Sequence, residues 1–383
     1  MASLKLTLEN LQNYKKQFNC ADHGFGRAPR GPAAHSGWLT ETHAFGQNPG
    51  QLRMLSYVPV SAPAESPLVV VLHGCTQTAE GYATHVGWRD LADRYGFRLL
   101  CPQQAPQNNA NGCFNWFLLD DIAREGGECQ SIHSMIQFMA GNSSAVYVTG
   151  LSAGGAMACA MLAAYPEVFV SGSIIAGLPY AAATDVASAF GAMHQPTTAS
   201  TKALGDRVRR ASDHAGPWPT VTIWHGAADR TVVPANADEL CKQWLAVHGL
   251  TDTAGHTNGM RTDWRNAADK IVVSRHVIKG MTHGAPVNSR GSDAYGSAAP
   301  YVLEVGISSS LVVARDWGIA DVVLDGEVLA AEKRHVIPLE NVSVSVPEHE
   351  TQQSSSELRR SKRNASIQTT IHAALKSAGL IRD

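Results

Sequence analysis

The sequence predicts an α/β protein in which helices flank a mostly parallel central sheet. From about residue 52 onward, short apolar runs of strand length alternate with segments of helical periodicity. The runs are nearly continuous in Val, Ile and Leu, which is typical of strands buried on both faces. Sites in such sheets lie at the carboxyl ends of the strands, so the segments that follow each run are the candidates for chemistry.

The predicted strands and helices follow from these runs. Strands are expected at residues 52–58, 68–72, 97–101, 146–149, 173–176, 221–224 and 271–278. Helices are expected at residues 88–95, 131–139, 153–164, 237–247 and 301–317.

Composition excludes several classes of protein. Of the 383 residues, 44% are hydrophobic and 17% are charged, which is enough for a sizeable core. The 31 Lys and Arg against 33 Asp and Glu leave a net charge of −2, so neither nucleic acid nor an anionic membrane is a favoured partner. No stretch approaches the roughly 20 apolar residues of a membrane span.

The N-terminus and the cysteines bear on location. Residues 1–20 contain four charged side chains and no apolar segment, so they do not resemble a secretory signal. We therefore expect a cytoplasmic protein, or a secreted one if a signal has been removed. The seven cysteines contain no C-x-x-C pair, so no zinc site or dense disulfide framework is predicted. Reduced thiols are expected, with one or two disulfides as the alternative.

A G-x-S-x-G motif runs from Gly150 to Gly154 and has Ser152 at its centre. It follows an apolar strand and precedes a helix of small residues, the setting of a nucleophile elbow. Glycines two residues before and after the serine remove Cβ atoms that would collide with the neighbouring strand and helix. The motif therefore predicts an α/β-hydrolase fold with Ser152 as nucleophile. An ordinary serine cap of the helix is the alternative.

A catalytic serine needs a base, and the base needs an orienting acid. In this fold an Asp or Glu and then a His follow the serine along the chain. Asp229 comes just after the strand at 221–224, and His283 just after the strand at 271–278. We predict that they complete a triad with Ser152.

Other residues compete for both roles. Asp229 could be a turn residue, and His276 lies within a strand, where a position in the core or on the sheet face is expected. The alternatives are Asp238 and Asp263 for the acid, and His276, His225 and His248 for the base.

An oxyanion hole needs two backbone N–H groups. One is expected from Ala153, directly after the nucleophile, and the other from Cys75, in the loop H-G-C-T-Q-T after the strand at 68–72.

These motifs resemble the polyhydroxybutyrate depolymerase family of esterases, which are α/β hydrolases, and are similar to carbohydrate esterases that cleave feruloyl and acetyl groups. The matching stretches span roughly residues 45–320. They are LHGCTQT (72–78), GW (87–88), CFNWF (113–117), VYVTGLSAGGAMA (146–158), AGLPY (176–180), WPTVTIWHGAADRTVVPANA (218–237) and GMTHGAP (280–286).

The resemblance implies the same triad and adds two points. The cysteines that match Cys75 and Cys113 are paired in secreted relatives, which implies a disulfide here. Many relatives carry Trp where this chain has Phe114. Secreted polymer-degrading members have a signal peptide and a separate binding domain, and the chain shows neither pattern. Soluble oligomers, small esters or intracellular polymer are therefore the expected substrates.

An apolar acyl cleft should lie beside the serine. Aromatic and apolar residues near the motif loops are candidates for its walls, although core packing is an equal alternative for each. They are Trp88, Trp116, Phe117, Leu178, Pro179 and Tyr180. Asn115 either orients a loop or contacts substrate.

The sequence therefore predicts a serine carboxylic-ester hydrolase that cleaves poly- or oligo-(3-hydroxyalkanoate) or other short acyl esters through an acyl-enzyme. The alternatives are a feruloyl or acetyl esterase acting on plant polysaccharide, and a catalytically silent binding protein of the same fold. No cofactor or metal is expected, since no H-E-x-x-H or paired-ligand spacing occurs. The oligomeric state is not predicted.

Three parts are expected along the chain. Residues 1–44 form an N-terminal helix and loop, 45–321 the catalytic domain, and 322–383 an extension with a mobile linker and a terminal helix. The basic cluster at 359–363 is expected to be solvated linker, with binding of an acidic partner as the alternative.

Overall fold

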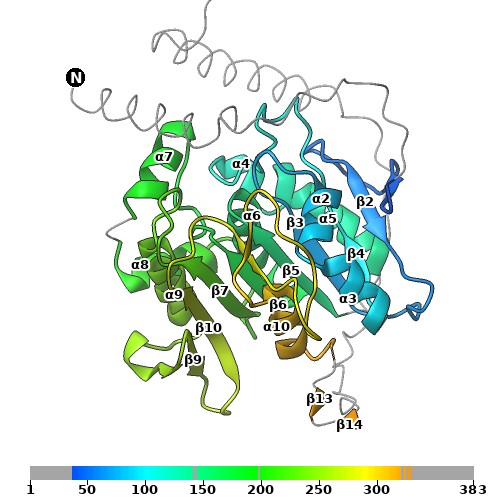
Figure 1. Cartoon of the computed structure of the whole chain (residues 1–383). Coiled ribbons are helices and arrows are strands. Elements are labelled where there is room, and N and C mark those ends of the chain that lie inside the picture. Colours follow the sequence, from blue (N-terminus) through cyan, green and yellow to red (C-terminus); the bar gives the residue numbers. More distant parts are fainter. Residues whose placement is uncertain (1–36, 141–144, 197–198, 321–322, 325–326, 329–383) are drawn as a thin grey trace, which may run out of the picture. The chain divides into compact units, whose positions relative to one another are not determined.

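The computed structural model describes residues 37–140, 145–196 and 199–320, and the backbone of two short strands beyond them. Its central feature is a ten-stranded sheet (Figure 1). In spatial order the strands are β1 (Thr40–Thr42), β2 (Met54–Tyr57), β4 (Arg98–Leu100), β3 (Leu68–Leu72), β5 (Val146–Leu151), β6 (Phe169–Ile175), β7 (Thr220–Gly226), β10 (Ile271–Ile278), β9 (Arg261–Arg265) and β8 (His256–Asn258).

The strands from β4 through β3, β5, β6 and β7 to β10 are all parallel to one another. At one edge β2 and β1 continue the sheet antiparallel, and at the other edge β9 and β8 do so. Because the central strands are parallel, the carboxyl ends of β3, β5, β7 and β10 lie at the same end of the sheet. The prediction of a mostly parallel sheet flanked by helices is confirmed.

Helices cover both faces of this sheet (Figure 1). Along β3, Leu68, Val70 and Leu72 join one hydrophobic cluster while Val69 and Val71 join the other, as the twofold alternation of a strand requires. The first cluster includes side chains of α5 (Gly127–Ala140), α6 (Ala153–Ala164), α8 (Thr201–Arg209) and α9 (Ala235–Val247). The second includes side chains of α2 (Ala79–His85), α3 (Trp88–Tyr95) and α10 (Ser309–Asp316).

The remaining elements are short and lie in connections. They are α4 (Leu119–Ile122), α7 (Val186–His194), the 3-10 helices Pro166–Val168 and Asp252–Ala254, and the strand pair β11 (Ala285–Val287) and β12 (Val302–Glu304). None of the helices in the described ranges is both long enough and apolar enough to cross a bilayer.

The helix predicted over residues 301–317 is wrong in its first half. Residues Val302–Glu304 form β12, which pairs in parallel with β11, and α10 starts only at Ser309. Between them Gly306 adopts φ +73°, and the Ser308 side chain accepts a hydrogen bond from the Leu311 N–H as the helix cap. The apolar residues at the start of the segment fit a helical and an extended pattern equally, so their spacing did not reveal the break.

The predicted domain boundary at residue 45 lies inside the sheet, because β1 pairs with β2 through Thr40–Ser56 and Thr42–Met54. This edge strand reads Thr-Glu-Thr and carries no apolar pattern that would reveal it. Within the predicted extension, β13 (Val323–Leu324) and β14 (Glu327–Val328) form an antiparallel pair. The helices predicted near the two termini, the linker and the basic cluster lie outside the described residues.

Buried histidines predict how stability depends on pH. Burial lowers the pKa of His73, His248 and His276 to about 4 in each case. In the unfolded chain an imidazole titrates near pH 6.5, so between about pH 6.5 and about pH 4 the unfolded state binds more protons than the folded state. The folded state therefore keeps its full stability above pH 6.5. The three histidines reduce this stability as the pH falls towards 4.

We expect the urea midpoint of unfolding to fall steadily between about pH 7 and about pH 4.5. His276→Gln should flatten this slope, whereas His43→Gln, at an exposed position, should leave it unchanged. A midpoint that is constant or rises on acidification would contradict the prediction.

Candidate active site

Ser152 occupies a sharp turn between β5 and α6, with φ 57° and ψ −117°. This backbone conformation is costly for a residue with a Cβ atom and is found mostly at functional sites. Its N–H donates to the Ile175 carbonyl on β6, and its side chain makes no capping hydrogen bond to α6. The alternative of an ordinary serine cap is therefore wrong, and the turn has the geometry of a nucleophile elbow.

Two glycines allow this turn to lie against its neighbours. A Cβ atom at Gly154 would overlap the carbonyl oxygen of Leu72 at the end of β3, and one at Gly150 would overlap the carbonyl oxygen of Gly154. The start of α6 therefore lies directly on the end of β3. The sequence-based explanation of the two motif glycines is confirmed.

Asp229 and His283 are joined by a buried hydrogen bond of 2.7 Å between Asp229 Oδ2 and His283 Nδ1. Asp229 follows β7 and His283 follows β10, which are adjacent parallel strands. At the base of the Asp229 loop, a Cβ atom on Gly226 would overlap the Met281 carbonyl oxygen, so the two loops are in backbone contact. Two polar residues that are distant in sequence are thus held together.

Asp229 is held by further donors. Its Oδ1 accepts hydrogen bonds from the backbone N–H groups of Thr231 and Val232, at 2.8 and 3.0 Å. The fully buried His225 places its Nε2 3.4 Å from Asp229 Oδ2. Burial alone would raise the pKa of Asp229, but hydrogen bonding to His225 and His283 outweighs it and holds this pKa well below its ordinary value. The carboxylate is therefore charged at neutral pH.

Of the five competing residues, four are engaged elsewhere, and the fifth, His225, lies beside Asp229. Asp238 pairs with Arg275, and Asp263 accepts hydrogen bonds from Arg261 and Ser274. His276 stacks on Trp224 with ring centroids 3.7 Å apart, and the His248 imidazole hydrogen-bonds to the Pro219 carbonyl oxygen. Each therefore has a structural role.

Ser152, Asp229 and His283 come after the carboxyl ends of β5, β7 and β10, which lie at the same end of the sheet. Among the described residues, no hydrogen bond joins Ser152 Oγ to the His283 imidazole. Such bonds are often long in unliganded enzymes and shorten when substrate binds. The pairing of Asp229 with His283 is observed, and the catalytic roles of all three residues stay predictions.

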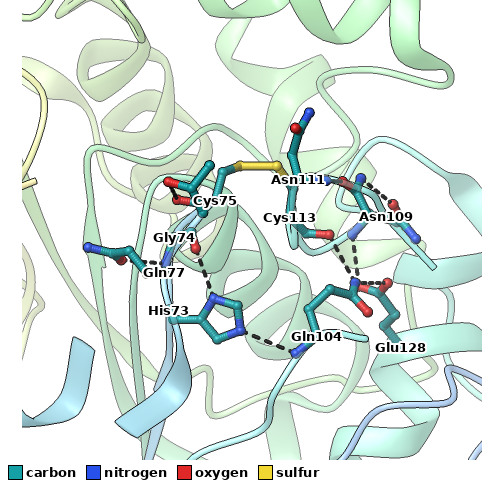
Figure 2. The surroundings of a disulfide bond; sticks show 11 residues. His73, Gly74, Cys75, Gln77, Gln104, Asn109, Asn111, Cys113 and Glu128 are labelled. Atoms are coloured by element: carbon teal, nitrogen blue, oxygen red, sulfur yellow. Dashed lines mark hydrogen bonds between the residues drawn. A yellow bond between two sulfur atoms is a disulfide. The ribbon is translucent and has the colours of Figure 1, made fainter. Parts of the chain in front are cut away.

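The loop after β3 is fixed by covalent and polar contacts, which Figure 2 shows. Cys75 and Cys113 form a disulfide, the pairing that the family resemblance implied. The Gly74 N–H donates to Gln77 Oε1 at 2.9 Å, and the Thr76 N–H donates to the Asn111 carbonyl at 2.7 Å. The residues on both sides of Cys75, Gly74 and Thr76, therefore have fixed hydrogen-bond partners.

Two N–H groups near the elbow have no hydrogen-bond acceptor within the described part of the chain. They belong to Cys75 and to Ala153, the first residue of α6, whose N–H has no intrahelical partner. These are the donors expected for an oxyanion hole, and that role stays a prediction. Within the same part of the chain, no group of three His, Cys, Asp or Glu side chains has the arrangement of a metal site.

The prediction that Trp88 lines the acyl cleft is wrong. Trp88 is 1% exposed and stacks on Trp317, with ring centroids 5.8 Å apart, in the core cluster that includes α3 and α10. Leu178 is also 1% exposed and offers a substrate almost no surface. Both residues follow a motif closely in sequence, but their side chains point into the protein.

The other cleft candidates stay predictions. Trp116 and Phe117 pack edge to face, with centroids 5.6 Å apart, and Tyr180 is half-buried against the core. Asn115 orients a loop: its N–H donates to Glu128 Oε2, and its Oδ1 accepts from Asn109.

Several buried polar residues next to the loop after β3 were not predicted from the sequence. His73, Gln104 and Glu128 are buried and hydrogen-bonded in a row (Figure 2). The H-G dipeptide after β3 was the available signal for His73. Gln104 and Glu128 have no local pattern that distinguishes them. Tyr301 was also missed: it has φ +61°, and its ring lies 6.1 Å from the His283 ring.

Comparisons with known proteins agree with this geometry. Residues 52–265 match the family described as Esterase PHB depolymerase. The chain is 42% identical over 291 residues to poly(3-hydroxyalkanoate) depolymerase C of Paucimonas lemoignei, covering 73% of this chain and 70% of that protein. It is 32% identical over 275 residues to an acetylxylan esterase of Coprinopsis cinerea, covering 67% of this chain and 72% of that protein.

Among solved structures, acetyl xylan esterase from Aspergillus awamori is similar with a TM-score of 0.58 and 26% identity, covering 64% of this chain and 94% of that one. The sheet order and the elbow after β5 place the protein among the α/β hydrolases. Within that class the chain belongs to the PHB depolymerase esterase family, and it is a carboxylic ester hydrolase.

The core position of Trp88 leads to a stability prediction. Trp88→Ala removes a buried stacked ring and should lower the free energy of unfolding by about 3–5 kcal/mol. At a temperature where the variant is folded, kcat/KM for p-nitrophenyl butyrate should stay within about threefold of wild type, because the ring does not contact substrate. Urea unfolding and ester assays measure both quantities, and Trp88→Phe is the milder control. A stable variant with a greatly raised KM would contradict this prediction and would indicate that Trp88 lines the cleft.

Proposed function

We propose that Ser152, His283 and Asp229 act as a catalytic triad that hydrolyses short-chain acyl esters, with oligomeric or polymeric 3-hydroxyalkanoate as the substrate class. The buried hydrogen bond between Asp229 and His283, in loops at the sheet edge where Ser152 occupies its strained turn, is the observation that carries this proposal.

The mechanism follows from the roles of these groups. The Asp229 carboxylate accepts a hydrogen bond from the Nδ1–H of His283, so that Nε2 carries the lone pair and takes the proton of Ser152 Oγ as this oxygen attacks the ester carbonyl. Asp229 stabilises the resulting imidazolium. The N–H groups of Cys75 and Ala153 stabilise the oxyanion of the tetrahedral intermediate.

Collapse of that intermediate breaks the ester bond, and the imidazolium returns its proton to the leaving alcohol. Water then attacks the acyl-enzyme, with His283 again as base. A second tetrahedral intermediate releases the acid and restores the Ser152 hydroxyl.

The substrate class rests on similarity. The relative from Paucimonas lemoignei, named as a poly(3-hydroxyalkanoate) depolymerase, is more similar in sequence to this chain than the acetylxylan esterase of Coprinopsis cinerea is. The alternative is an acetyl or feruloyl esterase acting on plant polysaccharide. It is favoured by the similarity to the acetyl xylan esterase structure from Aspergillus awamori.

Location stays a prediction. The cytoplasm was the expectation, whereas the disulfide between Cys75 and Cys113 is typical of oxidising compartments.

Removal of the nucleophile tests the proposed mechanism. Ser152→Ala should lower kcat on p-nitrophenyl butyrate by about 10⁴-fold or more, because the acyl-enzyme cannot form. Circular dichroism should remain that of the wild type, since the Ser152 side chain makes no capping hydrogen bond. Residual activity within tenfold of wild type would exclude Ser152 as nucleophile.

A substrate panel tests the substrate class. We expect kcat/KM for a 3-hydroxybutyrate trimer to exceed that for methyl ferulate and for acetylated xylo-oligosaccharide by at least about tenfold. Ser152→Ala is the control for background hydrolysis in each assay. The opposite order would favour the polysaccharide esterase.

A further inference from the structure

We propose that the side chain of Tyr301 forms a wall of the subsite that holds the alcohol part of the ester, and that it thereby determines which esters the enzyme prefers. This inference rests on the proposed esterase mechanism. It goes beyond that mechanism because it assigns recognition of one part of the substrate to a residue outside the triad and the oxyanion hole.

The loop after β3 holds the chain just before Tyr301. Gln77 donates from Nε2 to the Pro300 carbonyl oxygen at 3.1 Å. The Oε1 atom of the same side chain accepts a hydrogen bond from the Gly74 N–H at 2.9 Å (Figure 2). One glutamine amide therefore links Pro300 to the loop that carries Cys75, the expected oxyanion donor.

The loop of His283 holds Tyr301 from the other side. The Tyr301 carbonyl oxygen accepts a hydrogen bond from the Ala285 N–H at 2.8 Å. A Cβ atom on Gly284 would lie 2.9 Å from the same oxygen, so the two backbones are in contact. From the next residue onward, β12 pairs in parallel with β11. Tyr301 is therefore fixed between the two loops that border the proposed reaction centre.

The Tyr301 side chain presents an aromatic surface beside the imidazole. Its ring meets the His283 ring in an edge arrangement, with centroids 6.1 Å apart and an interplanar angle of 70°. One part of the side chain packs against the core cluster that includes α3 and α10, and the residue as a whole is half-buried. The remaining surface of Tyr301 is accessible next to the proposed base.

Neither the backbone nor the core explains a tyrosine at this position. The φ angle of +61° is strained for a residue with a Cβ atom, and glycine would adopt it without that cost. The core does not require the ring, because the residue is only half-buried. Strained residues cluster at functional sites, where contact with a ligand favours a side chain that the fold alone does not need.

The position beside His283 selects the alcohol part of the substrate. As the ester C–O bond breaks, the His283 imidazolium gives its proton to the oxygen of the departing alcohol, so this oxygen lies at the imidazole. The acyl carbon is then bonded to Ser152 Oγ. In a 3-hydroxyalkanoate oligomer the departing alcohol is the next 3-hydroxyacyl unit, whose short alkyl branch fits against an aromatic ring.

Esters that share one acyl group test this role. Tyr301→Ala and Tyr301→Gly remove the ring, and Tyr301→Phe keeps it without the hydroxyl. Tyr57→Ala is the matched control, because Tyr57 is another half-buried tyrosine packed against the same cluster, with its ring on Trp38.

Three quantities are measured for each variant. The first is the ratio of kcat/KM for benzyl butyrate to that for methyl butyrate, which give the same butyryl-enzyme. The second is the ratio of kcat/KM for p-nitrophenyl hexanoate to that for p-nitrophenyl acetate, which differ only in the acyl group. The third is the rate of hydrolysis of the butyryl-enzyme, followed by rapid quench and mass spectrometry of the intact protein.

We expect Tyr301→Ala and Tyr301→Gly to lower the benzyl-to-methyl ratio by about tenfold or more, because the larger alcohol loses its contact with the ring. The hexanoate-to-acetate ratio should stay within about twofold of wild type, since the acyl group does not contact Tyr301. Hydrolysis of the butyryl-enzyme should stay within about threefold, because the alcohol has left before this step. Tyr301→Phe and Tyr57→Ala should keep all three quantities within about twofold.

Three results would overturn the proposal. The first is a benzyl-to-methyl ratio in Tyr301→Ala within about twofold of wild type, and the second is an equally large change in the hexanoate-to-acetate ratio. The third is a fall in butyryl-enzyme hydrolysis as large as the fall in kcat/KM, which would make Tyr301 a support of His283 only.

Two controls keep these results interpretable. If Tyr301→Ala does not fold, the same ratio in Tyr301→Gly decides, because glycine adopts the positive φ without strain. Failure of the esterase mechanism itself would be distinguishable, since the wild type would then hydrolyse none of these esters or Ser152→Ala would hydrolyse them equally well.

Discussion

The hydrogen bond between Asp229 and His283 is the interaction on which the proposed chemistry of this protein depends. It brings a charged carboxylate and an imidazole together in a buried site, where an unpaired charge would be costly. Backbone N–H groups of Thr231 and Val232 and the nearby His225 help to hold the carboxylate. Asp229 is therefore fixed before substrate arrives, and the proposed mechanism needs little reorganisation when the His283 imidazole becomes charged.

Backbone packing places the rest of the site around this pair. At Gly154 and Gly226 the absence of a Cβ atom allows α6 to lie against the end of β3 and the Asp229 loop against the His283 loop. The disulfide and the buried polar residues beneath Cys75 hold the third loop. Strained backbone at Ser152 and Tyr301, beside the proposed reaction centre, is maintained by this dense surrounding structure.

Local pattern predicted the parallel sheet and the position of Ser152, because strand periodicity and the glycine spacing of the elbow are properties of neighbouring residues. Asp229 and His283 were predictable from their places after strands. Pairing of Cys75 with Cys113 came from family resemblance and not from spacing. Trp88 was assigned to the cleft wrongly, because closeness to a motif in sequence does not reveal which way a side chain points. The His73 network depends on long-range contacts that no local pattern contains.

The most direct test of the triad is the site of covalent reaction with a fluorophosphonate. The account predicts a single adduct per chain, mapped by peptide mass spectrometry to Ser152, with its rate of formation greatly reduced in His283→Ala. An adduct on a different residue, or an active enzyme that does not react with the probe, would contradict it.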